Sequence, residues 1–220
     1  MLVVMRAPPQ RAADQLNASF CILLGALIGT RAGFVAANWG YFQAHALEIP
    51  QVWLGGLSWA GAAAGGLFSL ALIARVRRCG LGTLADEMVP LALLLMLAAW
   101  LGAWESGVAY GALLPHAWWA SPAVDEWGAW AMRIPLQPLG ALSALAILGL
   151  VDQLHSRLRQ PGEAASLAWL GIALTTFGLS FLRADPAQLW RGWRLDSWAA
   201  LVLTGLSLLF CLVAFWPRHT

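Results

Sequence analysis

The chain has 220 residues, of which 60% are hydrophobic and only 11% are charged, and its formal net charge is +2. Soluble globular domains carry about 25% charged residues, so this composition excludes a water-soluble protein. A small charge scattered along the chain also provides no basic surface for nucleic acid. The composition instead predicts an all-α, polytopic integral membrane protein.

Hydrophobic runs near the roughly 20 residues needed to cross a bilayer occupy most of the chain. They predict six transmembrane helices in a single transmembrane domain over residues 1–220. In chain order, the approximate bounds of the helices are Leu16–Ala37, Val52–Ala74, Met88–Trp104, Leu136–Val151, Ser166–Leu182 and Ser197–Trp216. The short apolar start of the chain, followed at once by Arg6, is not expected to be a signal peptide.

The distribution of arginines predicts the orientation, because cytoplasmic loops carry the excess of positive charge. Eight arginines fall on the side of the two termini: Arg6, Arg11, Arg75, Arg77, Arg78, Arg157, Arg159 and Arg218. Four fall on the other side: Arg133, Arg183, Arg191 and Arg194. We therefore expect a cytoplasmic N-terminus and a cytoplasmic C-terminus. The Trp-rich segment 105–135 then faces outward, as an arm lying against the lipid headgroups.

Glycines recur every four residues on the first two predicted helices. Gly25, Gly29 and Gly33 lie on the first helix, and Gly61 and Gly65 lie on the second. This spacing aligns small residues on one face, where two helix backbones approach closely. We expect these glycines to mark helix packing.

Arg31 lies inside the first predicted helix, about six residues before its end. An arginine at the centre of a membrane helix costs about 2.5–3.5 kcal/mol on insertion scales, so it needs a partner or a wet cavity. The alternative is that its long side chain extends outward to lipid phosphates.

The sequence around Arg31 carries further information. The stretch Gly29–Val35 reads GTRAGFV, and it is followed by His45–Ile49 (HALEI), Val52–Trp59 (VWLGGLSW) and Ala85–Leu91 (ADEMVPL). In order and spacing, these segments resemble the prolipoprotein diacylglyceryl transferase family. The family segments read G-x-R-x-G-[YF]-V, H-P-L-E-I, V-W-x-G-G-[ML]-S-F and A-D-x-x-A-P-L. A weaker likeness extends from about residue 12 to residue 216.

The resemblance implies transfer of a diacylglyceryl group from phosphatidylglycerol to the lipobox cysteine thiol of a prolipoprotein, in the bacterial cytoplasmic (inner) membrane. It implies neither a metal nor any other cofactor. The implied partners are a membrane phospholipid and the signal peptide of a prolipoprotein. Four residues at matching positions are implied to bind the phospholipid headgroup: Arg31, Ser58, Gln137 and Arg183.

Several positions depart from the family pattern. Ala60 stands where the family has its essential His, Trp100 where it has the signature Arg, and Ala103 where it has an Asn. Other polar family residues correspond here to Ser106, Val108 and Thr176. The first helix of the family, with its own Tyr motif, has no counterpart. We expect either a misassigned start codon or an N-terminally shortened member.

Glu105 is the one new ionisable residue beside the signature segment. It is a candidate catalytic base, a candidate ion-pair partner of Arg31 or Arg133, or an interfacial carboxylate with no role. Two functions therefore stay open. One is a divergent transferase that uses Glu105 in place of the lost His. The other is a catalytically inactive relative that binds a lipid or a partner protein.

Overall fold

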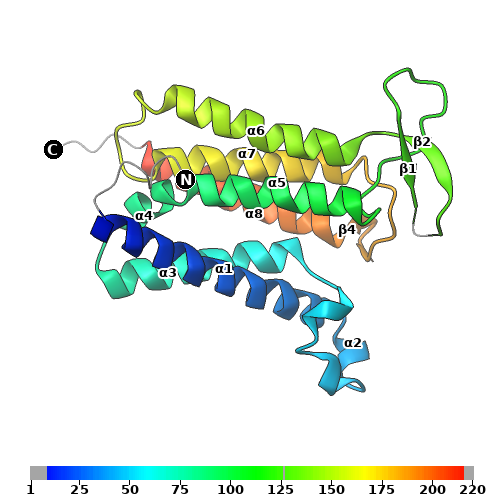
Figure 1. Cartoon of the computed structure of the whole chain (residues 1–220), viewed down its shortest axis with the longest axis horizontal. Helices are drawn as coiled ribbons and strands as arrows, with labels where there is room; N and C mark the ends of the chain where they lie inside the picture. Colours follow the sequence, from blue (N-terminus) through cyan, green and yellow to red (C-terminus); the bar gives the residue numbers. More distant parts are fainter. Residues whose placement is uncertain (1–8, 126, 216–220) are drawn as a thin grey trace. The chain divides into compact units, whose positions relative to one another are not determined.

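The computed structural model describes residues 9–125 and 127–215, most of which are helical (Figure 1). Its strands form only two short hairpins. Many large apolar side chains on the helices face outward, such as Phe20, Ile28, Phe68 and Leu212. Exposed apolar helix faces are what a lipid environment requires. The predicted all-α, polytopic membrane fold is confirmed.

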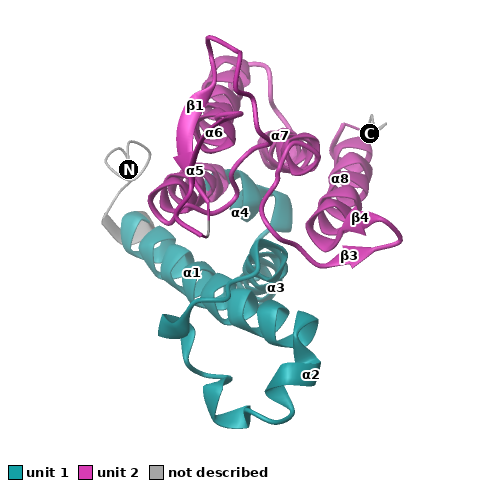
Figure 2. Ribbon diagram, turned by 90° about the vertical axis from the view of Figure 1, so that its right-hand side faces the viewer, with its two compact units in different colours: residues 1–87 teal, residues 88–220 magenta. Residues whose placement is uncertain are grey.

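The chain divides into two compact units, residues 1–87 and 88–220 (Figure 2). Unit 1 contains two long helices, two short ones and two 3₁₀ turns. These are α1 (Pro9–Ala37), α2 (Trp39–Phe42), the turns Ala46–Glu48 and Val52–Leu54, α3 (Trp59–Arg77) and α4 (Leu81–Glu87). The prediction of one domain over the whole chain stays a prediction.

In unit 1, α1 and α3 pack antiparallel through the glycines that share one face of each helix. A Cβ atom built on Gly29 would lie 2.9 Å from the Cα of Gly65, and one built on Gly33 would lie 2.9 Å from the Cα of Gly61. Gly25 instead makes room for the side chain of Ser69 on α3. At Gly29 and Gly33 the two backbones therefore touch directly, with no side chain between them.

Unit 2 is a group of four helices with a β-hairpin before α6 and another before α8. Its elements are α5 (Val89–Glu105), β1 (Ser121–Val124), β2 (Trp130–Arg133), α6 (Leu136–Leu154), α7 (Glu163–Ser180), β3 (Leu189–Trp190), β4 (Trp193–Arg194) and α8 (Leu195–Ala214). Both hairpins lie at the same end of the helices (Figure 1). Small residues fill the contacts between helices, including Ala165, Ser166 and Ser197, which are almost completely buried.

Each predicted span contains one long helix, and in the second span both bounds differ from the prediction. Its helix α3 begins at Trp59 rather than Val52, because Gly55 and Gly56 adopt φ angles of 81° and 72° that end regular structure. Ser58 then caps the helix. The first helix begins earlier than predicted, at Pro9, and residue 216, the predicted end of the last span, lies outside the described residues.

Within the described residues, four helices are long and apolar enough to cross a membrane. They are α1 from Ala12 onward, α3, α6 and α8, and the consecutive α4 and α5 make a fifth if they form one broken span. Helix α7, with Glu163 in its first turn, is not among them. The count of six spans therefore stays a prediction.

The predicted outward arm contains the β1–β2 hairpin, in which Ser121 pairs with Arg133 and Val124 with Trp130. Its tryptophans are exposed, with Trp118 reaching 95% and Trp127 reaching 78% exposure. The sequence analysis did not predict these strands. Exposed indole rings are consistent with an interfacial position, which remains a prediction for this arm.

Candidate functional site

Arg31 is buried in unit 1, and backbone carbonyl groups surround its guanidinium. Its Nε donates to the oxygen of Ile49 at 2.8 Å, and its Nη2 donates to the oxygen of Glu48 at 2.6 Å. Its Nη1 donates to the oxygens of Gly55 at 2.7 Å and Gly56 at 3.4 Å. The planar fork of an arginine suits such convergent acceptors. The charge is thus satisfied inside unit 1, and the side chain does not extend outward.

The local sequence explains why these carbonyls converge. Two 3₁₀ turns and the Gly55–Gly56 pair fold segment 46–56 back over the end of α1. The rings of Phe34 and Phe42 cover the guanidinium, with centroids 5.7 and 5.3 Å from its carbon. A Cβ on Gly56 would overlap the Phe34 ring, so the backbone there approaches as closely as only glycine allows.

A cleft of 450 Å³ opens beside Arg31. Its lining mixes aromatic, polar and charged groups: Arg31, Phe34, Asn38, Tyr41, Phe42, Glu48, Leu54, Gly55 and Gly56. A hollow with apolar walls and a few convergent polar atoms is typical of a small-molecule site. Large apolar side chains are exposed on the segment between α1 and α3 that lines this cleft, including Trp39, Leu47 and Trp53.

Tyr41 and Glu48 form a hydrogen-bonded pair in this cleft. The Tyr41 hydroxyl donates to the Glu48 carboxylate at 2.8 Å, and this bond, followed by desolvation and the carboxylate charge, raises the pKa of Tyr41. Tyr41 therefore stays a protonated donor at neutral pH. The His45 ring stacks on Tyr41 at 4.2 Å. Neither Tyr41 nor Glu48 was predicted from the sequence, although Glu48 lies in the HALEI segment.

Ser58, a predicted headgroup residue, caps α3. Its Oγ accepts a hydrogen bond from the Gly61 N–H at 3.2 Å, and its own N–H donates to the oxygen of Thr30 at 3.1 Å. These contacts hold the start of α3 against α1. The structure thus gives Ser58 a structural role, and headgroup binding by Ser58 stays a prediction.

In unit 2, the segment that follows α5 contacts two of the arginines near the hairpins. Segment 108–114, which follows α5, bridges to Arg183 through Gly111 and to Arg133 through Leu113. Gln137 donates to the oxygen of Val108 at 3.0 Å and is buried. The structure therefore brings the predicted residues Gln137 and Arg183 to the same end of unit 2.

Arg133 pairs with Asp125 of the arm, not with Glu105. The ion pair is 3.1 Å long, both side chains are 9% exposed, and the guanidinium lies 4.4 Å from the centroid of the Tyr110 ring. Glu105, the last residue of α5, is exposed and has no ion pair or hydrogen bond to its side chain within the described part of the chain. Its catalytic role stays a prediction.

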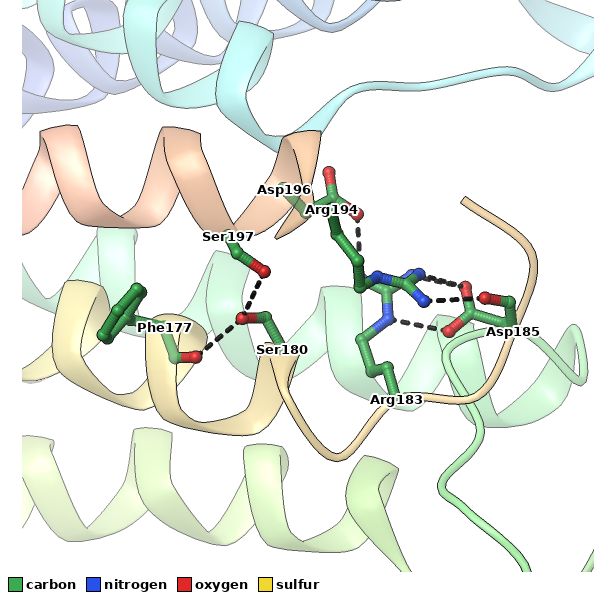
Figure 3. A network of polar contacts seen from close by, with 7 residues as sticks. All are labelled: Phe177, Ser180, Arg183, Asp185, Arg194, Asp196 and Ser197. Atoms are coloured by element: carbon green, nitrogen blue, oxygen red, sulfur yellow. Dashed lines mark hydrogen bonds and ion pairs between the residues drawn. The ribbon is translucent and has the colours of Figure 1, made fainter. Parts of the chain in front are cut away.

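Arg183 belongs to a network of two arginines and two aspartates (Figure 3). It donates to both oxygens of Asp185, at 2.9 and 2.6 Å, and to Asp196 at 3.2 Å. Arg194 lies 3.1 Å from the same Asp185 carboxylate. Burial lowers the pKa of Arg183, but the two aspartates outweigh this effect and raise it overall, so the guanidinium remains charged. Neither aspartate was predicted from the sequence.

Three positions that depart from the family pattern, Ala60, Trp100 and Ala103, carry uncharged side chains. Trp100 packs its ring into the gap left by Gly140 of α6, where an added Cβ would lie 2.6 Å from the Trp100 Cγ. Ala60 lies in the first turn of α3, and Ala103 lies in the last turn of α5. An indole ring thus fills the contact between α5 and α6.

Comparisons with known proteins agree with the sequence resemblance. Residues 2–213 match the family model described as prolipoprotein diacylglyceryl transferase. The chain is 30% identical to a phosphatidylglycerol–prolipoprotein diacylglyceryl transferase of Rhodospirillum rubrum, over 84% of this chain and 68% of that protein. It is 28% identical to the protein of that name from Geobacter sulfurreducens, over 85% and 74%. For the Bordetella avium protein the identity is 29%, over 89% and 75%.

Proposed function

Because the chain belongs to the prolipoprotein diacylglyceryl transferase family, we propose that it is a membrane protein of lipoprotein biosynthesis that binds a phospholipid headgroup in the Arg31 cleft. We further propose that standard diacylglyceryl transfer by this chain is absent or very weak. The substrates named for its relatives, phosphatidylglycerol and a prolipoprotein, are then its proposed ligands.

The weak-transfer proposal rests on the three replaced family residues, and on three arginines of unit 2 that already pair within the chain. Arg133, Arg183 and Arg194 each form an ion pair with an aspartate of the chain itself. The loss of one well-placed donor to a developing charge typically lowers a rate by about 10²–10³. Ala60, Trp100 and Ala103 together replace a proton-handling group and two donors that the resemblance implies.

The composition of the Arg31 cleft supports headgroup binding. The aromatic rings supply the walls. The polar contacts come from the Tyr41 hydroxyl oxygen and from the one of the five Arg31 N–H groups that the carbonyls leave unused. Exposed Trp39, Trp53 and Leu57 on the same loop suit the boundary between headgroups and acyl chains. A phospholipid entering from the bilayer would therefore meet an apolar rim before the polar atoms.

Complementation tests the proposal about activity. The chain, expressed in cells depleted of their own transferase, should fail to restore lipid attachment to a lipobox substrate. Immunoblotting should first show that the chain reaches the membrane. Full rescue would refute the proposal. Loss of that rescue in Glu105→Gln would then indicate that Glu105 is the substitute base. If rescue fails, regained lipid attachment in the double variant Ala60→His/Trp100→Arg would show that the remaining site still accepts the lipid.

We also propose that both termini lie in the cytoplasm and that the membrane is the bacterial cytoplasmic (inner) membrane. Reporter fusions or cysteine accessibility should then place Arg77 inside and Trp118 outside. The opposite result at both positions would reverse the orientation.

A further inference from the structure

We infer that the C-terminal end of α3 binds an anionic phospholipid, at a site formed by Arg75, Arg78 and the small residues before them. The site lies at the other end of the α1–α3 pair from the Arg31 cleft. The two helices are antiparallel, so the end of α3 lies beside the start of α1, where Arg77 donates to the oxygen of Asp14. The inference does not depend on the proposed function.

The first observation is a cleft of 350 Å³ at this end of α3. It is lined by Ala71, Ala74, Arg75, Arg78, Cys79 and Leu81. The lining of this shallow cleft thus combines small apolar residues with two arginines. Leu72 and Val76 are exposed on the adjoining surface of α3, at 53% and 73%, and so extend the apolar surface along the helix.

The second observation is that no described residue pairs with either arginine of the cleft. Arg77 is held by Asp14, but neither the Arg75 nor the Arg78 guanidinium forms an ion pair or hydrogen bond within the described residues. In unit 2, Arg133, Arg183 and Arg194 pair with aspartates, whereas Arg157, Arg159 and Arg191 form no ion pair with a described residue. Two guanidinium groups in a cleft with small apolar residues complement a phosphate attached to an acyl chain.

The third observation is the backbone of Arg78. It adopts a left-handed conformation, with φ 52° and ψ 34°, at the position after the helix where glycine is usual. The Cys79 N–H reaches back to the oxygen of Ala74 at 3.1 Å and closes the turn. An arginine here is less favourable than glycine for the backbone, and it places a second guanidinium at the cleft. Favourable contacts with the helix dipole account for basic residues near a helix end, but not for an arginine in this conformation.

The chemistry of the site therefore selects a lipid with a net negative phosphate. Arg75 and Arg78 would hold the phosphodiester, and an acyl chain would lie over Ala71, Leu72 and Val76. Each arginine near an anionic headgroup contributes modestly, so we expect loss of both to weaken binding on the order of tenfold.

The rate of chemical labelling of Cys79 can report lipid binding, because Cys79 lines the cleft. With Cys21→Ser and Cys211→Ser it is the only thiol in the chain. Uncharged N-ethylmaleimide should label it several-fold more slowly in nanodiscs containing anionic phospholipid than in phosphatidylcholine alone. This ratio should fall toward one in Arg75→Gln/Arg78→Gln. It should persist in the matched variant Arg157→Gln/Arg159→Gln, which removes the same charge elsewhere.

Arg78→Gly separates binding from folding. Glycine suits the left-handed position, so this variant should unfold at a higher temperature while it loses protection of Cys79. Equal labelling in both lipid mixtures, or equal protection in all variants, would overturn the inference. Protection by inorganic phosphate in a neutral detergent would also overturn it, since a free anion would then be the ligand. None of these results would affect the complementation result.

Discussion

Replacement of Gly65 by alanine should lower the free energy of unfolding by about 1–3 kcal/mol, the usual cost of overpacking a close contact. The new Cβ would lie 2.9 Å from the Gly29 Cα and would overlap the Gly25 carbonyl oxygen. Both neighbours are backbone atoms and cannot rotate away, so α1 and α3 must separate. Denaturation in mixed micelles, followed by tryptophan fluorescence, measures the difference.

Gly66 is a matched control on the same helix. A Cβ at Gly66 would meet the Ala26 Cβ at 3.7 Å and the Ile22 Cγ2 at 3.9 Å, which are ordinary contacts. Gly66→Ala should therefore be neutral, or stabilising by up to about 1 kcal/mol through helix propensity. Equal effects at the two positions would show that α1 and α3 do not pack through their glycine faces.

Arg31→Met should open segment 46–56. It removes the donors to the carbonyls of Glu48, Ile49, Gly55 and Gly56. The Glu48 oxygen keeps its bond from the Gln51 N–H, and each of the others costs up to about 1–3 kcal/mol until water reaches it. Amide hydrogen exchange should become faster in this segment, while the glycine contact between α1 and α3 keeps its protection. Native mass spectrometry should also show less phospholipid retained, since the cleft loses its shape.

Arg31→Lys distinguishes charge from geometry. A lysine keeps the positive charge, but one ammonium group cannot satisfy carbonyls on both turns, so exchange should remain fast. Normal exchange in Arg31→Lys would mean that the charge alone orders the segment. Unchanged exchange in Arg31→Met would contradict the structural role of the carbonyl cage.

The positions of the long helices were largely predictable because length and apolarity decide them. The start of α3 was not, since Val52, Trp53 and Leu54 are as apolar as a helix in a bilayer requires. The backbone there is set by the Gly55–Gly56 pair and by the carbonyl bonds to Arg31. Apolarity does not report such tertiary contacts.

The candidate site was predictable only where a residue type is rare in its surroundings. Arg31 was identified because a charge inside an apolar run needs an explanation. Its partners are backbone oxygens, which no residue type reveals. Asp125 pairs with Arg133 because the hairpin register brings the two together, and Asp185 meets Arg183 through the turn after α7. These pairings depend on strands and loops that the apolar pattern does not show.

The carbonyl cage around Arg31 also has a consequence for biogenesis. Helix α1 carries this charge into the bilayer, yet the oxygens that satisfy it belong to residues 48–56, which are synthesised later. While α1 is alone, the guanidinium has no internal acceptors and opposes stable insertion. Helix α1 should therefore enter the bilayer fully only when α3 follows, with the two helices inserting as one hairpin.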